Sequence, residues 1–221
     1  MGHVIQLTAS DSHRLNAYRV DPSGIAKGGV VVIQEIFGVN IHVRDVCDRF
    51  ASAGYSTIAP ALFDRIQPGI ELDYTEEDLG QGFRYMQEVG NDNPMQDIQA
   101  AADVLKETGK VGAIGFCWGG QLAWLASKQV DLDCSVAYYG VAVHETLDPA
   151  PNCPVILHFA DYDAFVPPEA ANKVRERYPE MPIYNYAANH GFNCDRRDDY
   201  NEACAAQAME RTLEFFGHHL K

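Results

Sequence analysis

The sequence VGAIGFCWGGQLAW, residues 111–124, joins an apolar run to a helix-like segment through a glycine-rich turn. Residues 111–116 are apolar or glycine, as in a buried strand, and apolar side chains recur at helical spacing after the turn. Cys117 stands at the junction, between Gly115 and Gly119. Glycine permits the close backbone contacts that a sharp strand-to-helix turn needs. The stretch therefore predicts a strand, a turn centred on Cys117 and a helix.

This turn places a thiol where many hydrolases carry the serine of a G-x-S-x-G sequence. A side chain at this point faces the N-terminal dipole and the free N–H groups of the following helix. That environment favours a thiolate over a thiol and stabilises an oxyanion. Cys117 is thus a candidate nucleophile. The alternative is a small buried cysteine that serves only the packing of the turn.

Apolar runs alternate with amphipathic segments along the rest of the chain. Periodicity and turn residues predict strands at 30–33, 56–63, 111–116, 134–140, 154–160 and 183–187, and helices at 42–55, 76–89, 94–108, 118–128, 169–178 and 199–217. Asn93 is the expected N-cap of the helix that begins at Pro94. The alternation favours a mostly parallel sheet with helices on both faces, in a single α/β domain over residues 1–221.

The composition limits the partners and the compartment. Seventeen Lys and Arg against 31 Asp and Glu give a formal net charge of −14, and no basic cluster offsets it, which argues against nucleic acid and acidic membranes as partners. No apolar run approaches the ~18 residues of a membrane span, and the N-terminus lacks a secretory signal pattern. The six cysteines are irregularly spaced without C-x-x-C, so we expect free thiols in the cytoplasm rather than disulfides or a structural zinc site.

A nucleophile needs a base, and the base needs an orienting acid. In hydrolases with this turn, the acid and the histidine follow later strands, in the order nucleophile, acid, histidine. Asp161 and Asp163 follow the strand predicted at 154–160, and His190 lies in a loop before the last helix. Of the eight histidines, only His190 has both the required order and a loop position. The sequence therefore contains the elements of a catalytic triad with Cys117.

Five segments together resemble the dienelactone hydrolase family (carboxymethylenebutenolidase and relatives): QEIFGVN (34–40), GFCWGG (115–120), YYGV (138–141), HFADYDAFVP (158–167) and NHGF (189–192). The resemblance covers about residues 28–216 and implies the α/β-hydrolase fold. It also implies a triad of Cys117, Asp163 and His190. Asp163 is chosen over Asp161 because it directly precedes the segment that ends in FVP.

The resemblance also implies roles for residues around the triad. Glu35, in QEIFG, is expected to contact the thiol and to help deliver it as a thiolate when substrate enters. Its place at the C-terminal end of a strand is where open α/β sheets bind ligands, although a solvated loop carboxylate is the alternative. The backbone N–H groups of Ile36 and Trp118 are expected to form the oxyanion hole. Neither a metal nor an organic cofactor is implied.

The substrate implied is a small ester or lactone, cleaved through a thioester on the nucleophile. Lactone-specific members of the family bind a substrate carboxylate with two arginines. Arg65 matches the first in its spacing, with a solvated surface cation as the alternative. At the position of the second stands Cys194, followed by Arg196 and Arg197.

Other functions remain compatible with these residues. The favoured one is a cysteine-dependent hydrolase that acts as a monomer or a small homo-oligomer. Trp118 stands where lactone-specific members carry a smaller aliphatic residue, so an esterase or thioesterase with a different substrate is an alternative. A non-enzymatic small-molecule binder is another, although a binder does not need an ordered triad. A thiol-based redox sensor lacks an obvious resolving cysteine.

Overall fold

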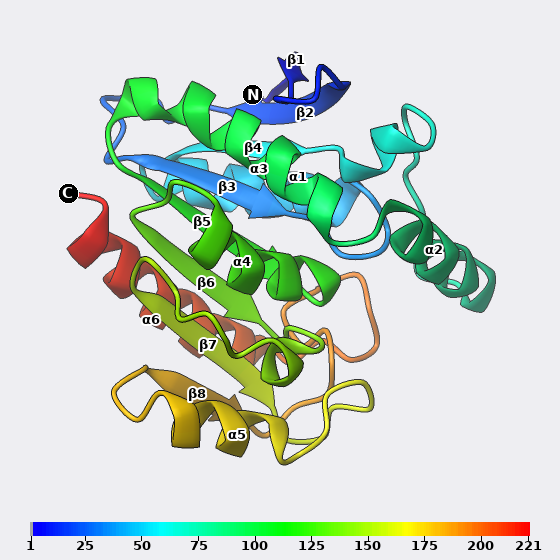
Figure 1. Cartoon of the computed structure of the whole chain (residues 1–221), viewed down its shortest axis with the longest axis vertical. Coiled ribbons are helices and arrows are strands. Elements are labelled where there is room, and N and C mark those ends of the chain that lie inside the picture. Colours follow the sequence, from blue (N-terminus) through cyan, green and yellow to red (C-terminus); the bar gives the residue numbers. More distant parts are fainter. Residues whose placement is uncertain (1) are drawn as a thin grey trace.

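The computed structural model, which describes residues 2–221, contains one eight-stranded sheet (Figure 1). The strands are β1 (His3–Thr8), β2 (Arg14–Val20), β3 (Gly29–Ile33), β4 (Ser56–Pro60), β5 (Val111–Phe116), β6 (Cys134–Tyr138), β7 (Val155–Ala160) and β8 (Ile183–Tyr186). Their order in the sheet is β1-β2-β4-β3-β5-β6-β7-β8. β2 pairs antiparallel with β1 and β4, and all other pairs are parallel. The predicted mostly parallel sheet is confirmed, in the arrangement of the α/β-hydrolase fold.

Helices cover both faces of this sheet, as predicted. They are α1 (Ile41–Ser52), α2 (Glu76–Val89), α3 (Asp92–Leu105), α4 (Trp118–Gln129), α5 (Ala170–Arg177) and α6 (Glu202–His219). α3, α4 and α5 pack on one face, and α1 and α6 pack on the other. The side chains of β3 alternate between these two cores and are all buried, so the strand has a continuous apolar sequence.

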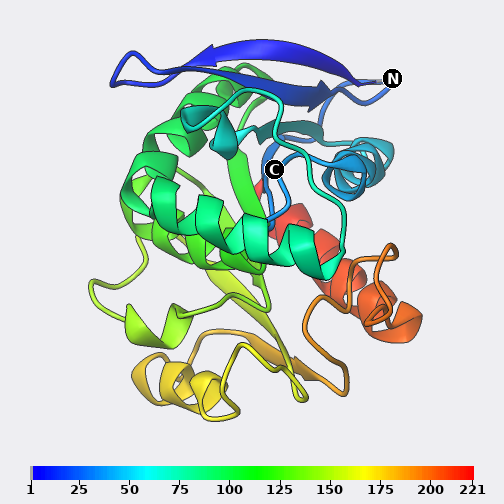
Figure 2. The same ribbon diagram turned by 90° about the vertical axis from the view of Figure 1, so that its right-hand side faces the viewer.

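Two further features position the functional site. α2 lies beyond the end of the sheet toward which the parallel strands point (Figure 1). It approaches the loop after β3 at Gly82, where a Cβ atom would lie 2.2 Å from the carbonyl oxygen of Ile36. Only glycine allows this approach without a shift of the helix. Figure 2 shows the β1–β2 hairpin at one edge of the molecule and α5 near the opposite edge.

The structure corrects two predictions and adds one element. The sequence did not predict the hairpin of β1 and β2. The strand expected at 56–63 ends at Pro60, and a 3-10 helix follows over Leu62–Arg65. α3 begins at Asp92 and not at Pro94, so Asn93 lies inside the helix and is not its N-cap. Asn91 occupies the N-cap position, but its side chain makes no hydrogen bond to the backbone of α3. It accepts a hydrogen bond from the indole N–H of Trp118 in α4 instead.

Along residues 2–221, the helices are all too short or too polar to cross a lipid bilayer.

Candidate active site

Cys117 occupies a strained turn between β5 and α4. Its φ is 57° and its ψ is −119°, a backbone conformation that residues other than glycine rarely adopt. Neighbouring backbone leaves no space for a Cβ atom on the flanking glycines. At Gly115 it would lie 1.8 Å from the carbonyl oxygen of Gly119, and at Gly119 it would lie 2.3 Å from that of Gln34. The predicted strand, turn and helix are confirmed, and Cys117 stands at the N-terminus of α4.

His190 is fixed by a buried carboxylate. Its Nδ1 lies 2.7 Å from Oδ2 of Asp163, and the two side chains are 4% and 1% exposed. Oδ1 of Asp163 accepts hydrogen bonds from the backbone N–H groups of Phe165, at 2.8 Å, and Val166, at 3.0 Å. Asp161 is exposed instead. The structure therefore brings Asp163, and not Asp161, to the histidine, as the family resemblance implied.

Neighbouring groups raise the pKa of the His190 imidazole. Burial alone would lower the pKa of the imidazole, but the negative charge of a Cys117 thiolate and the hydrogen bond with Asp163 raise it to about 10. A protonated imidazole next to a thiolate is the activated state of a cysteine nucleophile. Within residues 2–221, the structure joins His190 to Asp163 through Nδ1, while Nε2 of His190 makes no hydrogen bond.

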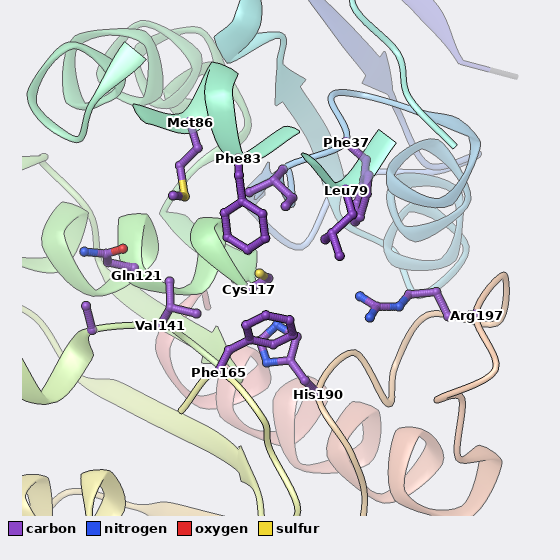
Figure 3. A pocket seen from close by; sticks show the side chains of 12 residues that line it. Phe37, Leu79, Phe83, Met86, Cys117, Gln121, Val141, Phe165, His190 and Arg197 are labelled. Atoms are coloured by element: carbon purple, nitrogen blue, oxygen red, sulfur yellow. The ribbon is translucent and has the colours of Figure 1, made fainter. Parts of the chain in front are cut away.

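Cys117 and His190 both line a cavity of about 280 Å³ (Figure 3). Its walls are mostly apolar and consist of Ile36, Phe37, Leu79, Phe83, Met86, Cys117, Gln121, Val141, Ala142, Phe165, His190 and Arg197. Arg197 is the only arginine or lysine among them. The volume and the few convergent polar groups suit a small organic molecule with one anionic group.

The expected substrate-binding role of Arg65 is contradicted by its surroundings. Arg65 does not line the cavity. Its Nε and Nη2 donate to the two carboxylate oxygens of the fully buried Asp97, at 2.7 and 2.8 Å, and its Nη1 donates to Asp11 at 2.8 Å. This bidentate ion pair uses the guanidinium of Arg65 for a structural contact.

Of the two arginines that follow the position of Cys194, only Arg197 reaches the cavity. Arg196 is 47% exposed and pairs with Asp45 at 2.8 Å. Arg197 is 16% exposed, and its Nη2 lies 3.2 Å from Asp199. Burial would lower the pKa of Arg197, but nearby groups, Glu35 first among them, raise it above its usual value. Arg197 is therefore a charged side chain that points into an apolar cavity.

The backbone next to the nucleophile offers two donors. Within the described residues 2–221, the N–H groups of Ile36 and Trp118 donate no hydrogen bond. Trp118 is the first residue of α4, where an N–H has no partner within the helix, and Ile36 lines the cavity. Both groups are therefore available to an anion.

The side chain of Trp118 has a structural role. It is fully buried, stacks on Phe63 with ring centroids 5.6 Å apart, and donates from Nε1 to Asn91 at 2.9 Å. It does not line the cavity. Its size therefore does not restrict the substrate directly, although the sequence comparison suggested a difference at this position.

Glu35 is 1% exposed, which contradicts the alternative of a solvated loop carboxylate. Neither of its carboxylate oxygens makes a hydrogen bond within residues 2–221. It does not line the cavity and lies next to His42 and Cys194.

The sequence analysis missed one wall of the cavity. Leu79, Phe83 and Met86 come from α2, at spacings of four and three residues, and all three are only partly buried. Such spacing marks one apolar face of a helix. That face was visible in the sequence, but nothing in the sequence showed that it covers a cavity instead of the core.

Comparisons with known proteins identify relatives of the whole chain. The model of the dienelactone hydrolase family matches residues 15–220. Carboxymethylenebutenolidases of Pseudomonas putida and Pseudomonas knackmussii are each 31% identical over 222 residues, which cover 96% of this chain and 94% of those proteins. A crystal structure from Klebsiella pneumoniae, described as that of a candidate dienelactone hydrolase, superimposes with a TM-score of 0.84 at 28% identity and covers 98% of both chains. The chain therefore belongs to the dienelactone hydrolase family, and the likeness first visible in five short segments extends through its whole fold.

Proposed function

We propose that the chain is a single-domain hydrolase of small carboxylic esters or lactones, with Cys117 as its nucleophile and a thioester as its intermediate. The observation that carries this proposal is the position of Cys117 in a strained turn, in one apolar cavity with a histidine that a buried carboxylate orients. The names of the relatives, carboxymethylenebutenolidases, support a lactone or ester as the substrate class.

In this mechanism the Cys117 thiolate attacks the carbonyl carbon, and the oxyanion accepts hydrogen bonds from the N–H groups of Ile36 and Trp118. The His190 imidazolium gives its proton to the departing alkoxide, and the thioester remains. Neutral His190 then takes a proton from water as the water attacks the thioester. The acid is released, and the thiolate and the imidazolium are restored. Asp163 holds the imidazole in one tautomer throughout.

Glu35 has a supporting role in the proposal. Glu35 is buried, and neither of its carboxylate oxygens makes a hydrogen bond within residues 2–221. We assign Glu35 the task of accepting the proton of the Cys117 thiol when a substrate enters and of returning it once the product leaves, so that the nucleophile is a thiolate only while a substrate is bound.

Alkylation tests the identity of the nucleophile, because the six cysteines are all free thiols. Burial raises the pKa of Cys47 and Cys194 to about 12 and of Cys153 to about 11, and it also raises the pKa of Cys134 and Cys204. Iodoacetamide near neutral pH should therefore label Cys117 first, and the loss of esterase activity should follow its labelling in peptide maps. Full activity after complete labelling of Cys117 would refute the proposal.

Arg197 should select acidic substrates. Loss of one partner of a buried charge pair costs about 2–5 kcal/mol, so Arg197→Met should lower kcat/KM for a lactone carboxylate by about 30-fold to several-thousand-fold. The methyl ester of the same compound should be hydrolysed almost as before. Steady-state kinetics on both compounds separate these effects.

Arg196→Met is the matched control, since it removes the same charge one residue earlier from an exposed ion pair. It should leave both substrates nearly unaffected. Equal losses on the acid and its ester in Arg197→Met would show that Arg197 supports the loop and does not bind a substrate carboxylate.

A further inference from the structure

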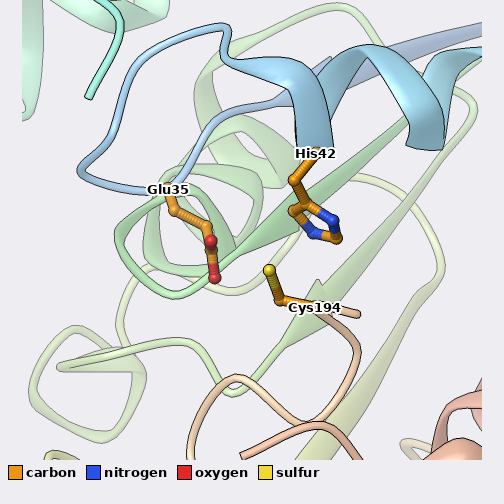
Figure 4. Close-up of side chains that lie close together, drawn as sticks. All are labelled: Glu35, His42 and Cys194. Carbon is orange, nitrogen blue, oxygen red and sulfur yellow. The ribbon is translucent and has the colours of Figure 1, made fainter. Parts of the chain in front are cut away.

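Three potential metal ligands lie close together, and none of them lines the cavity. The donor atoms of Glu35, His42 and Cys194 are all within 4.8 Å of one another. They come from the loop after β3, the first turn of α1 and the loop after His190, and their side chains converge on one point (Figure 4). Glu35 is 1% exposed, and the other two are fully buried.

The polar atoms of this cluster lack partners. Within residues 2–221, neither carboxylate oxygen of Glu35 and neither ring nitrogen of His42 makes a hydrogen bond. Buried polar atoms without partners are costly, and a charged carboxylate is the most costly of them. Four such atoms on two adjacent side chains indicate that a group with positive charge belongs between them.

We propose that Glu35, His42 and Cys194 bind one divalent ion of the zinc class. Carboxylate oxygen, imidazole nitrogen and thiolate sulfur are together a donor set that Zn²⁺ prefers, and three protein ligands with one open position are common for this ion. Metal–ligand distances of ~2.0–2.3 Å place such donors ~3.3–3.7 Å apart, so the three side chains need to close in by about 1 Å.

One neighbour of the cluster suits this ion. Oδ1 of Asp195 lies 3.7 Å from Nδ1 of His42, within reach for a carboxylate that orients a ligating imidazole. A thiolate and a carboxylate together balance the charge of a divalent ion. The occupied site is therefore neutral overall.

The site has a consequence for the enzyme, which rests on the function proposed above for Glu35. A carboxylate bound to a metal ion cannot accept the proton of the Cys117 thiol. The ion therefore inhibits the hydrolase reversibly, from a position outside the substrate cavity.

Cobalt spectroscopy tests the binding without any assay of activity. The experiment uses metal-free Cys117→Ser protein, so that the nucleophile cannot provide the thiolate. Titration with Co²⁺ should give a thiolate charge-transfer band in the near ultraviolet that saturates at one equivalent. Cys194→Ser, or Cys194→Ala if that variant does not fold, should abolish the band, and His42→Gln should weaken the binding at least tenfold.

The matched controls are Cys204→Ser and His144→Gln, which replace the same residue types outside the cluster and should retain the band. A titration without a saturable band would overturn the proposal, as would a band that persists without Cys194.

In a second arm, Zn²⁺ should inhibit the wild-type esterase, a chelator should restore the rate, and His42→Gln should be at least tenfold less sensitive. A rate that Zn²⁺ leaves unchanged, in protein shown to hold the ion, would overturn the inhibitory role. If the protein proves inactive on esters, the spectra still decide whether the site exists.

Discussion

Cys117→Ala should lower kcat for the hydrolysis of an aryl ester by a factor on the order of 10⁶, the size of the loss when a serine protease loses its nucleophile. The methyl group of alanine cannot attack a carbonyl carbon, and the oxyanion donors without a nucleophile give only a small residual rate. Alanine should fold in this turn because it has the same backbone restrictions as cysteine at a φ of 57°. Steady-state kinetics with purified protein measure the effect.

Cys204→Ala is the appropriate control, because it removes a thiol that does not line the cavity, and it should retain the wild-type rate. Cys117→Ser should remain nearly inactive, since a hydroxyl is far harder to ionise than a thiol. Substantial turnover in Cys117→Ala would mean that another group attacks the substrate, and the thioester mechanism would be wrong.

Asp163→Asn should lower kcat by about 10⁴, as the corresponding change does in a serine protease. The contacts of Asp163 explain the size of the effect. The backbone N–H groups of Phe165 and Val166 require an acceptor, so the amide oxygen of asparagine should face them. The NH₂ group then faces Nδ1 of His190 and forces the imidazole into the wrong tautomer. The variant should still fold, and KM should change much less than kcat.

Asp161→Asn provides the matched comparison two residues away. The Asp161 carboxylate is exposed and accepts a hydrogen bond from Nδ2 of Asn185 at 2.8 Å. Its replacement should change kcat less than about threefold, since surface changes of this kind are worth within ~0.5 kcal/mol. A large loss in Asp161→Asn with little loss in Asp163→Asn would show that Asp161, and not Asp163, is the acid that orients the histidine.

The turn at Cys117 could be predicted because its signals are local. A buried strand, two glycines and an apolar helix follow one another within 14 residues, and each element depends mainly on its own sequence. The choice of Asp163 over Asp161 needed the family resemblance, because both residues follow β7 directly. The structure then gives the physical reason, since the loop turns two backbone N–H groups toward Asp163.

Features that depend on distant residues could not be predicted. Arg65 has the spacing of a substrate-binding arginine, but its partners Asp11 and Asp97 lie 54 and 32 residues away in the sequence. The hairpin of β1 and β2 forms the edge of the sheet, where exposed positions interrupt the apolar pattern of a strand. The grouping of Glu35 with His42 and Cys194 likewise arises only when three separate segments meet.

The separation of α2 from the triad has a consequence for how such enzymes diversify. Leu79, Phe83 and Met86 shape the cavity from a single helix, whereas the residues to which the proposal assigns the chemistry come from other segments. Substitutions at these three positions should therefore alter the shape of the cavity without replacing any residue of the proposed mechanism. A directed-evolution library confined to these positions, with Gly82 kept constant for its contact with Ile36, would sample new substrates at little risk to catalysis.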